Sequence, residues 1–221
     1  MLNIKFNNYQ LLQTLNYHED SVCKIIELSN EKLISCSWDS SIIFYSKDSN
    51  NKYTKDYQIT TDNQCYCIIQ TKENEICYEK LQSLNNKHSI CFYDMLGKNV
   101  IKIINDLELG FITLNSFNMI AEDLLLIVGE NKLYIINVNQ YDLIRIVDAP
   151  GSSFIFSSCV LNRNFFLTGD SNKNIKQWKV EGDNLELIST KENAHIDTIY
   201  TIIKLRDGHI LTGAYDEIKI W

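Results

Sequence analysis

Residues 195–221 read HIDTIYTIIKLRDGHILTGAYDEIKIW and contain the pattern from which the fold follows. Apolar residues alternate with other residues over 199–205. A polar Arg-Asp-Gly segment follows, then a short apolar run over 210–213, and then a third run that ends at Trp221. Alternation with a period of two, interrupted by turn residues, is typical of neighbouring antiparallel strands. We therefore predict three strands of a meander in this stretch.

A second copy of this pattern lies near the other end of the chain, where residues 18–45 read HEDSVCKIIELSNEKLISCSWDSSIIFY. His18 and Asp39 are 21 residues apart, as are His195 and Asp216. Similar segments at distant positions of one chain indicate a repeat architecture.

A serine or threonine in each clear copy gives the repeat length. Thr168 and Thr212 are 44 residues apart, and Ser35 and Thr212 are 177 apart, close to four such steps. Two weaker copies are therefore expected between the first and the fourth. The strands of copies two to four are predicted at 64–70, 75–79, 89–94 and 99–104; at 112–120, 124–129, 132–138 and 142–147; and at 154–161, 165–169, 174–180 and 185–190.

The motif residues of these copies resemble those of the WD-repeat family of β-propellers. A blade of that family carries a histidine, a Ser/Thr-x-x-x-Asp segment and an aromatic residue closing its third strand, with a period of about 40–45 residues. The matching positions are His18, Ser35, Asp39 and Tyr45; Thr168, Asn172 and Trp178; and His195, Thr212, Asp216 and Trp221. The resemblance implies an all-β propeller of about five four-stranded blades, with residues 1–221 as a single domain.

The repeats are degenerate. Copies two and three lack the motif residues, Tyr45 stands where tryptophan is usual, and Asn172 stands where aspartate is usual. The last copy is one residue short between Asp216 and Trp221, and it ends at a third strand. Residues 9–17 (YQLLQTLNY) alternate in character, so we predict that they supply its fourth strand and close the ring. The alternatives are an open arc or a fragment of a larger propeller.

The resemblance also implies a structural role for the motif residues, as a buried hydrogen-bonded chain within each blade. A hydrolase triad of Ser35, His18 and Asp39 is the chemical alternative, but the sequence signals neither an exposed nucleophile nor an oxyanion pocket. We therefore predict no enzyme activity, and we expect His195→Ala and Asp216→Ala to lower the melting temperature.

Composition narrows the class of partner. The net charge is -7, with 21 basic against 28 acidic residues, which disfavours nucleic acid and anionic membranes. No apolar run approaches the roughly 20 residues of a membrane span, and no phosphate-binding glycine motif occurs. Seven cysteines without framework spacing indicate a reducing compartment, so we expect a cytoplasmic location. Association with the cytoskeleton or a cilium belongs to the structural-subunit alternative given below. We expect no cofactor and no small-molecule substrate.

A zinc site is conceivable in the second copy, because Cys65 and Cys67 share a strand face and other candidate ligands follow, Cys77, Cys91 and His88. Structural zinc usually binds Cys-x2–4-Cys pairs on turns, so we predict no metal and assign these cysteines to the core. His88 and His209 are predicted to be solvated turn residues.

Four residues are candidates for partner contact. Trp38 and Tyr215 each precede the blade aspartate in a turn that faces water, and large aromatic residues are common energetic anchors of interfaces. Cys23 and Tyr200 begin first strands on the same rim, which by resemblance receives partner peptides. Packing of Trp38 on a neighbouring loop is the alternative, and Ser171, the fourth-copy equivalent, is too small to be informative.

The sequence thus predicts a non-enzymatic WD-repeat scaffold or adaptor that binds other proteins or peptides within a larger eukaryotic complex. A structural subunit of a cytoskeletal, ciliary or ubiquitin-ligase assembly is the alternative, and a hydrolase on a propeller is the third hypothesis.

Overall fold

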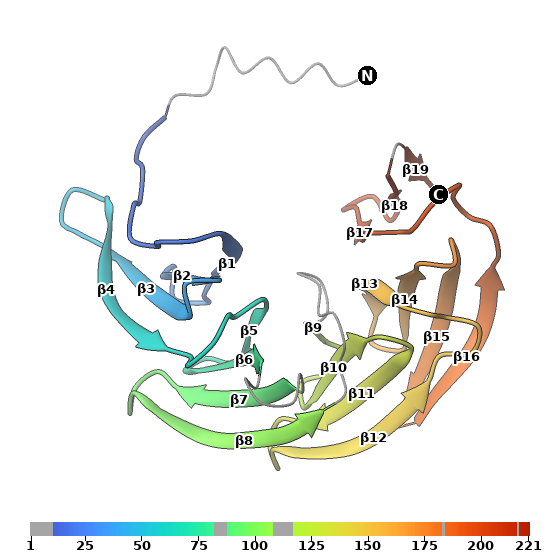
Figure 1. Ribbon diagram of the computed structural model, residues 1–221, viewed down its shortest axis with the longest axis horizontal. Coiled ribbons are helices and arrows are strands. Elements are labelled where there is room, and N and C mark those ends of the chain that lie inside the picture. Colours follow the sequence, from blue (N-terminus) through green and yellow to red (C-terminus); the bar gives the residue numbers. More distant parts are fainter. Residues whose placement is uncertain (1–10, 82–87, 108–116, 183, 216) are drawn as a thin grey trace.

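A computed structural model describes residues 11–81, 88–107, 117–182, 184–215 and 217–221. All regular structure in these ranges is β-strand, and it forms five antiparallel sheets that follow one another around a common centre (Figure 1). No helix in the described ranges is long and apolar enough to cross a membrane. The predicted all-β architecture of five blades is confirmed.

The strands follow chain order within every blade. Blade one contains β1 (Val22–Glu27), β2 (Leu33–Ser37), β3 (Ser41–Lys47) and β4 (Tyr53–Thr60). Blade two contains β5 (Ile68–Lys72), β6 (Glu75–Leu81), β7 (His88–Asp94) and β8 (Asn99–Leu107). Blade three contains β9 (Phe117–Met119), β10 (Leu124–Gly129), β11 (Lys132–Asn137) and β12 (Asp142–Asp148). Blade four contains β13 (Ile155–Asn162), β14 (Phe165–Asp170), β15 (Ile175–Glu181) and β16 (Asn184–Lys191), and blade five β17 (Thr201–Lys204), β18 (Ile210–Gly213) and β19 (Ile218–Ile220).

Two predicted first strands are shorter than expected. In blade two the strand begins at Ile68 rather than at residue 64, because the preceding segment binds blade one: the amide of Cys65 donates to the Ser37 carbonyl at 3.1 Å. In blade three only Phe117–Met119 is observed, and residues 112–116 of the prediction lie outside the described ranges.

The antiparallel order places equivalent loops at one end of the propeller. In blade one, Val22 at the start of β1 pairs with Ser37 at the end of β2, and Ile155 and Asp170 do the same in blade four. The starts of the first strands and the turns between second and third strands therefore share one end. We call this end the upper rim and the opposite one the lower rim.

Neighbouring blades hold together through apolar side chains that pack between their faces. Ile34 of blade one packs with Ile76 of blade two, and Cys159 of blade four packs with Ile202 of blade five. Burying one such aliphatic side chain contributes about 1.5–3 kcal/mol relative to leaving it exposed. Each blade is thus supported by the blades beside it.

The N-terminal segment does not lie where we predicted. Residues 11–17 form no strand, and the Gln13 side chain pairs with the backbone of Tyr53 in β4, accepting from its amide at 2.9 Å and donating to its carbonyl. The side-chain amide of Gln13 thus provides hydrogen-bond partners for the backbone of Tyr53. The N-terminal segment therefore lies beside blade one and not beside β19. Blade five accordingly has three strands in the described ranges, and residues 9 and 10 lie outside them.

Candidate functional site

The motif residues of blade one form a continuous hydrogen-bonded chain. His18 Nδ1 lies 2.8 Å from Asp39 Oδ2, its Nε2 lies 2.7 Å from Ser35 Oγ, and Ser35 Oγ lies 3.0 Å from the Tyr45 hydroxyl. Because a carboxylate only accepts, the His18 Nδ1–H donates to Asp39, and Nε2 accepts from Ser35. The hydrogen bonds run in the order that the resemblance implied.

Asp39 also shapes the turn between β2 and β3. Its Oδ1 accepts from the backbone amide of Ser41 at 2.9 Å, and Ser40 has a φ of 63°. Burial alone would raise the pKa of Asp39, but hydrogen bonds from Ser41, the Glu19 amide and His18 lower this pKa to about 2. The carboxylate is therefore stabilised in its charged form.

Blade five contains a similar hydrogen-bonded chain among its described residues. His195 Nε2 lies 2.6 Å from Thr212 Oγ1, and Trp221 Nε1 donates to that oxygen at 2.8 Å. His195 Nδ1 meets Glu217 Oε1 at 2.8 Å. Asp216, the predicted partner, lies outside the described residues. The longer side chain of Glu217 makes this contact in the blade that is one residue short.

Blade four keeps only half of the pattern. Trp178 Nε1 donates to Thr168 Oγ1 at 2.9 Å, and both residues are buried. Asn172 is exposed and instead donates to the Gly151 carbonyl at 2.6 Å. The Asn172 side chain therefore ties the turn to the preceding loop and does not extend a buried chain.

A buried ion pair stabilises blade four, and sequence reasoning missed it. Lys176 Nζ lies 2.6 Å from Asp170 Oδ2, and Ser152 Oγ donates to the same oxygen at 2.7 Å. The side chains of Lys176 and Asp170 are 2% and 1% exposed. One feature of the sequence could have revealed the burial of Lys176. It lies two residues before Trp178, so the two side chains share one face of the strand.

His88 corrects one prediction. It is buried at the start of β7, and its Nδ1 lies 2.6 Å from Glu79 Oε1, so it is not a solvated turn residue. The buried carboxylate of Glu79 draws the ring inward, and Glu79 also accepts from the Tyr66 amide at 3.2 Å. His209 is exposed and lies 3.1 Å from Asp207.

The cysteines of blade two lie in the apolar core. Cys65, Cys67, Cys77 and Cys91 are free and buried. Burial is the main cause that raises the pKa of Cys67 and Cys91, each to about 11, so these thiols are protonated at neutral pH. Within the described ranges, no three His, Cys, Asp or Glu side chains are grouped to hold a metal.

Ser35 has the neighbours of a hydrolase serine but not its accessibility. It is 2% exposed, and its hydroxyl is already hydrogen-bonded to His18 and Tyr45. A nucleophile needs room beside it for the reacting carbonyl and for oxyanion donors. The buried arrangement at Ser35 therefore supports the blade and offers no approach to a substrate.

The upper rim carries exposed aromatic side chains at two places. Trp38 is 41% exposed, and its ring lies 5.9 Å from that of Tyr66, so it both faces water and packs on the neighbouring blade. At the second place the Phe156 ring lies 5.4 Å from Tyr200 and 6.3 Å from Phe154. Sequence reasoning missed the two phenylalanines.

The remaining rim candidates differ in exposure. Tyr215 is 81% exposed and Tyr200 is 50% exposed, whereas Cys23 is half-buried. Burial raises the pKa of Cys23 to about 11, and its Sγ lies 3.7 Å from the Ser21 carbonyl. Cys23 thus contributes little surface, and the aromatic residues dominate the rim.

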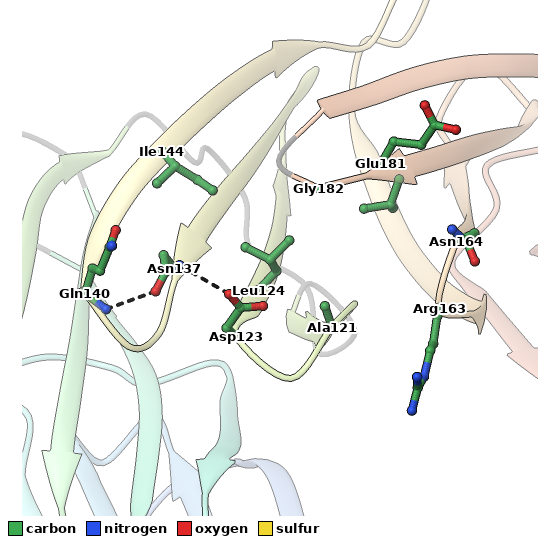
Figure 2. A pocket seen from close by; sticks show the side chains of 11 residues that line it. Ala121, Asp123, Leu124, Asn137, Gln140, Ile144, Arg163, Asn164, Glu181 and Gly182 are labelled. Carbon is green, nitrogen blue, oxygen red and sulfur yellow. Dashed lines mark hydrogen bonds between the residues drawn. The ribbon is translucent and has the colours of Figure 1, made fainter.

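The lower rim contains an open groove of about 480 Å³ between blades three and four (Figure 2). Asp123, Arg163 and Glu181 place charges of both signs along it. Asn137 Nδ2 donates to Asp123 at 3.5 Å, and Asn137 Oδ1 accepts from the Gln140 amide at 2.9 Å (Figure 2). These polar groups satisfy the turns of blade three.

Comparison with known proteins bears on the fold. No protein-family model matches the sequence, and no curated protein matches it. A solved structure that does match is the crystal structure of the WD40 beta propeller domain of Doa1, with a TM-score of 0.76 and 19% identity over 97% of this chain and 69% of that chain. The chain has the fold of a WD40 β-propeller. At this identity the likeness concerns the fold alone, and the WD40 architecture predicted from the motif residues is confirmed.

Proposed function

We propose that this WD40 propeller is a scaffold that binds other proteins or peptides on its upper rim. The fold serves in general as a platform for protein–protein interaction. The observation that carries the proposal is the exposure of large aromatic side chains at that end, with Tyr215 at 81%, Tyr200 at 50% and Trp38 at 41%. Trp and Tyr supply much contact area at little cost in side-chain entropy, and they are enriched among interface anchors.

The charges around these aromatic residues indicate the chemistry of the partner. Glu19 and Asp20 are exposed in the loop that precedes β1, and Asp197 is exposed in the loop that precedes β17. The chain as a whole carries a net charge of -7. A peptide with apolar side chains and flanking Lys or Arg residues would complement this rim, with its charges guiding association.

Rigidity is the physical contribution of the propeller. Asp39 and Glu217 are hydrogen-bonded to the buried imidazoles of His18 and His195, so the turns that bear Trp38 and Tyr215 are anchored to the blades. A preorganised rim loses little conformational entropy when it binds a partner. The buried hydrogen-bonded chains through His18 and His195 thus support binding by holding the turns of the upper rim in place.

The proposal is tested by affinity purification of partners with the double variant Trp38→Ala/Tyr215→Ala. Tyr215 faces solvent and Trp38 contacts the Tyr66 ring with part of its surface, so the melting temperature of the variant is measured first to establish that it is folded. Partners retained by the wild type should then be lost or at least tenfold depleted. Leu96→Ala is the matched control, because Leu96 is 74% exposed but lies on the lower rim, between β7 and β8. An unchanged partner list would contradict the proposal.

We also propose a cytoplasmic location. All seven cysteines are free, and six of them are buried. Free thiols at these positions are compatible with a reducing compartment, where disulfides do not persist.

A further inference from the structure

A small pocket opens on the lower rim between blades one and two. Its volume is about 190 Å³, and residues of the turn after β1, the turn after β7 and the outer strand β4 line it. Four of the lining residues are apolar or aromatic: Leu28, Phe44, Tyr57 and Met95. Pockets that enclose a whole drug-sized molecule measure roughly 300–1,000 Å³, so this pocket has room for a single large side chain.

The apolar walls of the pocket are held in place by the core. Leu28 and Phe44 are each 3% exposed, and both belong to the core that joins blades one and two. The Phe44 ring stacks on the Tyr57 ring, with centroids 4.2 Å apart and planes inclined by 9°. Tyr57 and Met95 pack against the same core. The site is therefore preformed, and a side chain can enter it with little rearrangement of the walls.

The mouth of the pocket is basic. Lys32 Nζ lies 3.1 Å from Asp56 Oδ2, so these two charges compensate one another. Lys98 Nζ lies 4.3 Å from the centroid of the Tyr57 ring, and no carboxylate in the described ranges forms an ion pair with it. The lining thus carries one more cation than anion, whereas the whole chain has a net charge of -7.

The groove between blades three and four has the opposite charge balance. It lies on the same rim, but among its described lining residues Asp123 and Glu181 outnumber the cation Arg163. The side-chain amides of Asn137 and Gln140 make its surface polar. An acidic ligand would therefore be attracted to the pocket and repelled from the groove.

The combination of apolar walls and a lysine without a carboxylate partner limits the chemistry of the ligand. A free inorganic anion could contact Lys98 but would leave the apolar walls in contact with water. A nucleic acid needs several cations along its backbone, and the net charge of -7 would repel it. A peptide with one large apolar side chain beside an Asp or Glu matches both parts of the pocket.

We propose that this pocket binds an acidic peptide segment of another protein, in which a Leu, Met or Phe is flanked by Asp or Glu. The apolar side chain packs against Leu28 and Phe44, and a neighbouring carboxylate accepts a hydrogen bond from Lys98. The cation–π contact with Tyr57 holds the ammonium group at the mouth. The pocket and the upper rim lie at opposite ends of the propeller, so this inference does not depend on the function proposed for the rim.

Selection from a phage-displayed library of random peptides tests the proposal. The library is panned on the purified 221-residue chain, and phage that also bind the variant Lys98→Glu are removed. Lys98 is exposed in a turn, so this variant should keep the melting temperature of the wild type. We expect the remaining peptides to combine a large apolar residue with neighbouring Asp or Glu residues. Failure to enrich any peptide, or enrichment of peptides without acidic residues, would overturn the proposal.

Fluorescence anisotropy with an enriched peptide gives the second measurement. Lys98→Glu should raise the Kd at least tenfold, because a repulsion replaces an attraction. Arg163→Glu is the matched control, since it makes the same change in net charge in an exposed lower-rim turn of blade four, and it should leave the Kd unchanged. Equal effects of the two variants would show attraction by net charge alone and would refute the pocket.

The peptide itself provides a test of the apolar walls. Replacing its large apolar residue by Ala should raise the Kd at least tenfold, because the pocket would then stay unfilled. An unchanged Kd would show that the apolar side chain does not enter the pocket, and the proposal would fail.

The two proposed binding surfaces are separated by exchanging their variants. Leu96 borders the pocket, so Leu96→Ala should weaken binding of the enriched peptide, whereas Trp38→Ala/Tyr215→Ala should not. Partners of the upper rim should show the reverse dependence. If only the rim variant weakens binding of the enriched peptide, the peptide belongs to the upper rim. The pocket proposal then fails, while the function proposed for the rim stands.

Discussion

Blades one and four each bury polar side chains between their strands and loops, but they pair these side chains differently. In blade one, the hydroxyl of Ser35 links Tyr45 to His18 and Asp39. Blade four has no histidine at this place, and a Lys176–Asp170 ion pair with Ser152 occupies its interior instead. Buried side-chain polar atoms in the described residues all have partners in both cases. Satisfied hydrogen bonds, and not particular motif residues, are what a blade requires.

The largest expected effect comes from breaking the ion pair of blade four. Lys176→Met leaves the carboxylate of Asp170 buried with no cation beside it, and removal of one partner of a buried pair costs about 3–5 kcal/mol. Chemical denaturation monitored by fluorescence should show this loss in the free energy of unfolding. The double variant Lys176→Met/Asp170→Ala is the control and should lose less than the sum of its single variants, because no lone charge remains. A cost below about 1 kcal/mol for Lys176→Met would contradict the buried pair.

An intermediate effect is expected from the histidine of blade one. His18→Ala leaves Ser35 and Asp39 each without one hydrogen-bond partner, which costs about 1–3 kcal/mol. His195→Ala should cost a similar amount in blade five, where the ring is hydrogen-bonded to Thr212 and Glu217. Thermal unfolding measures both, with His209→Ala as the control because His209 is exposed. Unchanged melting temperatures in both variants would show that the chains do not stabilise the blades.

The smallest expected change in stability at neutral pH comes from Asp39. Its contribution to stability depends on pH. Its pKa is lowered from 3.8 to about 2 in the folded protein, so its contribution to stability is complete above pH 4 and is lost as the pH falls towards 2. The difference in melting temperature between the wild type and Asp39→Asn should therefore shrink over this range. A constant difference from pH 7 to pH 2 would rule out the linkage.

The sequence allowed much of this architecture to be predicted, because strand alternation and a fixed period depend on local patterns. The hydrogen-bonded chain through His18, Ser35, Asp39 and Tyr45 was expected because these residues resemble the motif of WD repeats, and not from the strand pattern alone. The ion pair of Lys176 was not, since a lysine in a short strand is usually solvated and its burial depends on a partner that only the folded sheet places beside it. His88 was misassigned on the same grounds.

Two further differences arise from contacts between segments that are distant in sequence. His195 is hydrogen-bonded to Glu217, one position after the aspartate that the repeat spacing predicted. Residues 11–17 leave the predicted position because the Gln13 amide imitates a strand at the backbone of Tyr53. Neither contact has a periodic signal along the chain.

The one-sided packing of blade five affects how the molecule comes apart. In an array where each repeat is stabilised mainly by its neighbours, local stability falls from the middle towards any end that lacks one. Within the described residues, blade five has blade four on one side and an exposed face on the other. Blade five, and by the same argument blade one, should therefore open before the three blades that have a neighbour on each side.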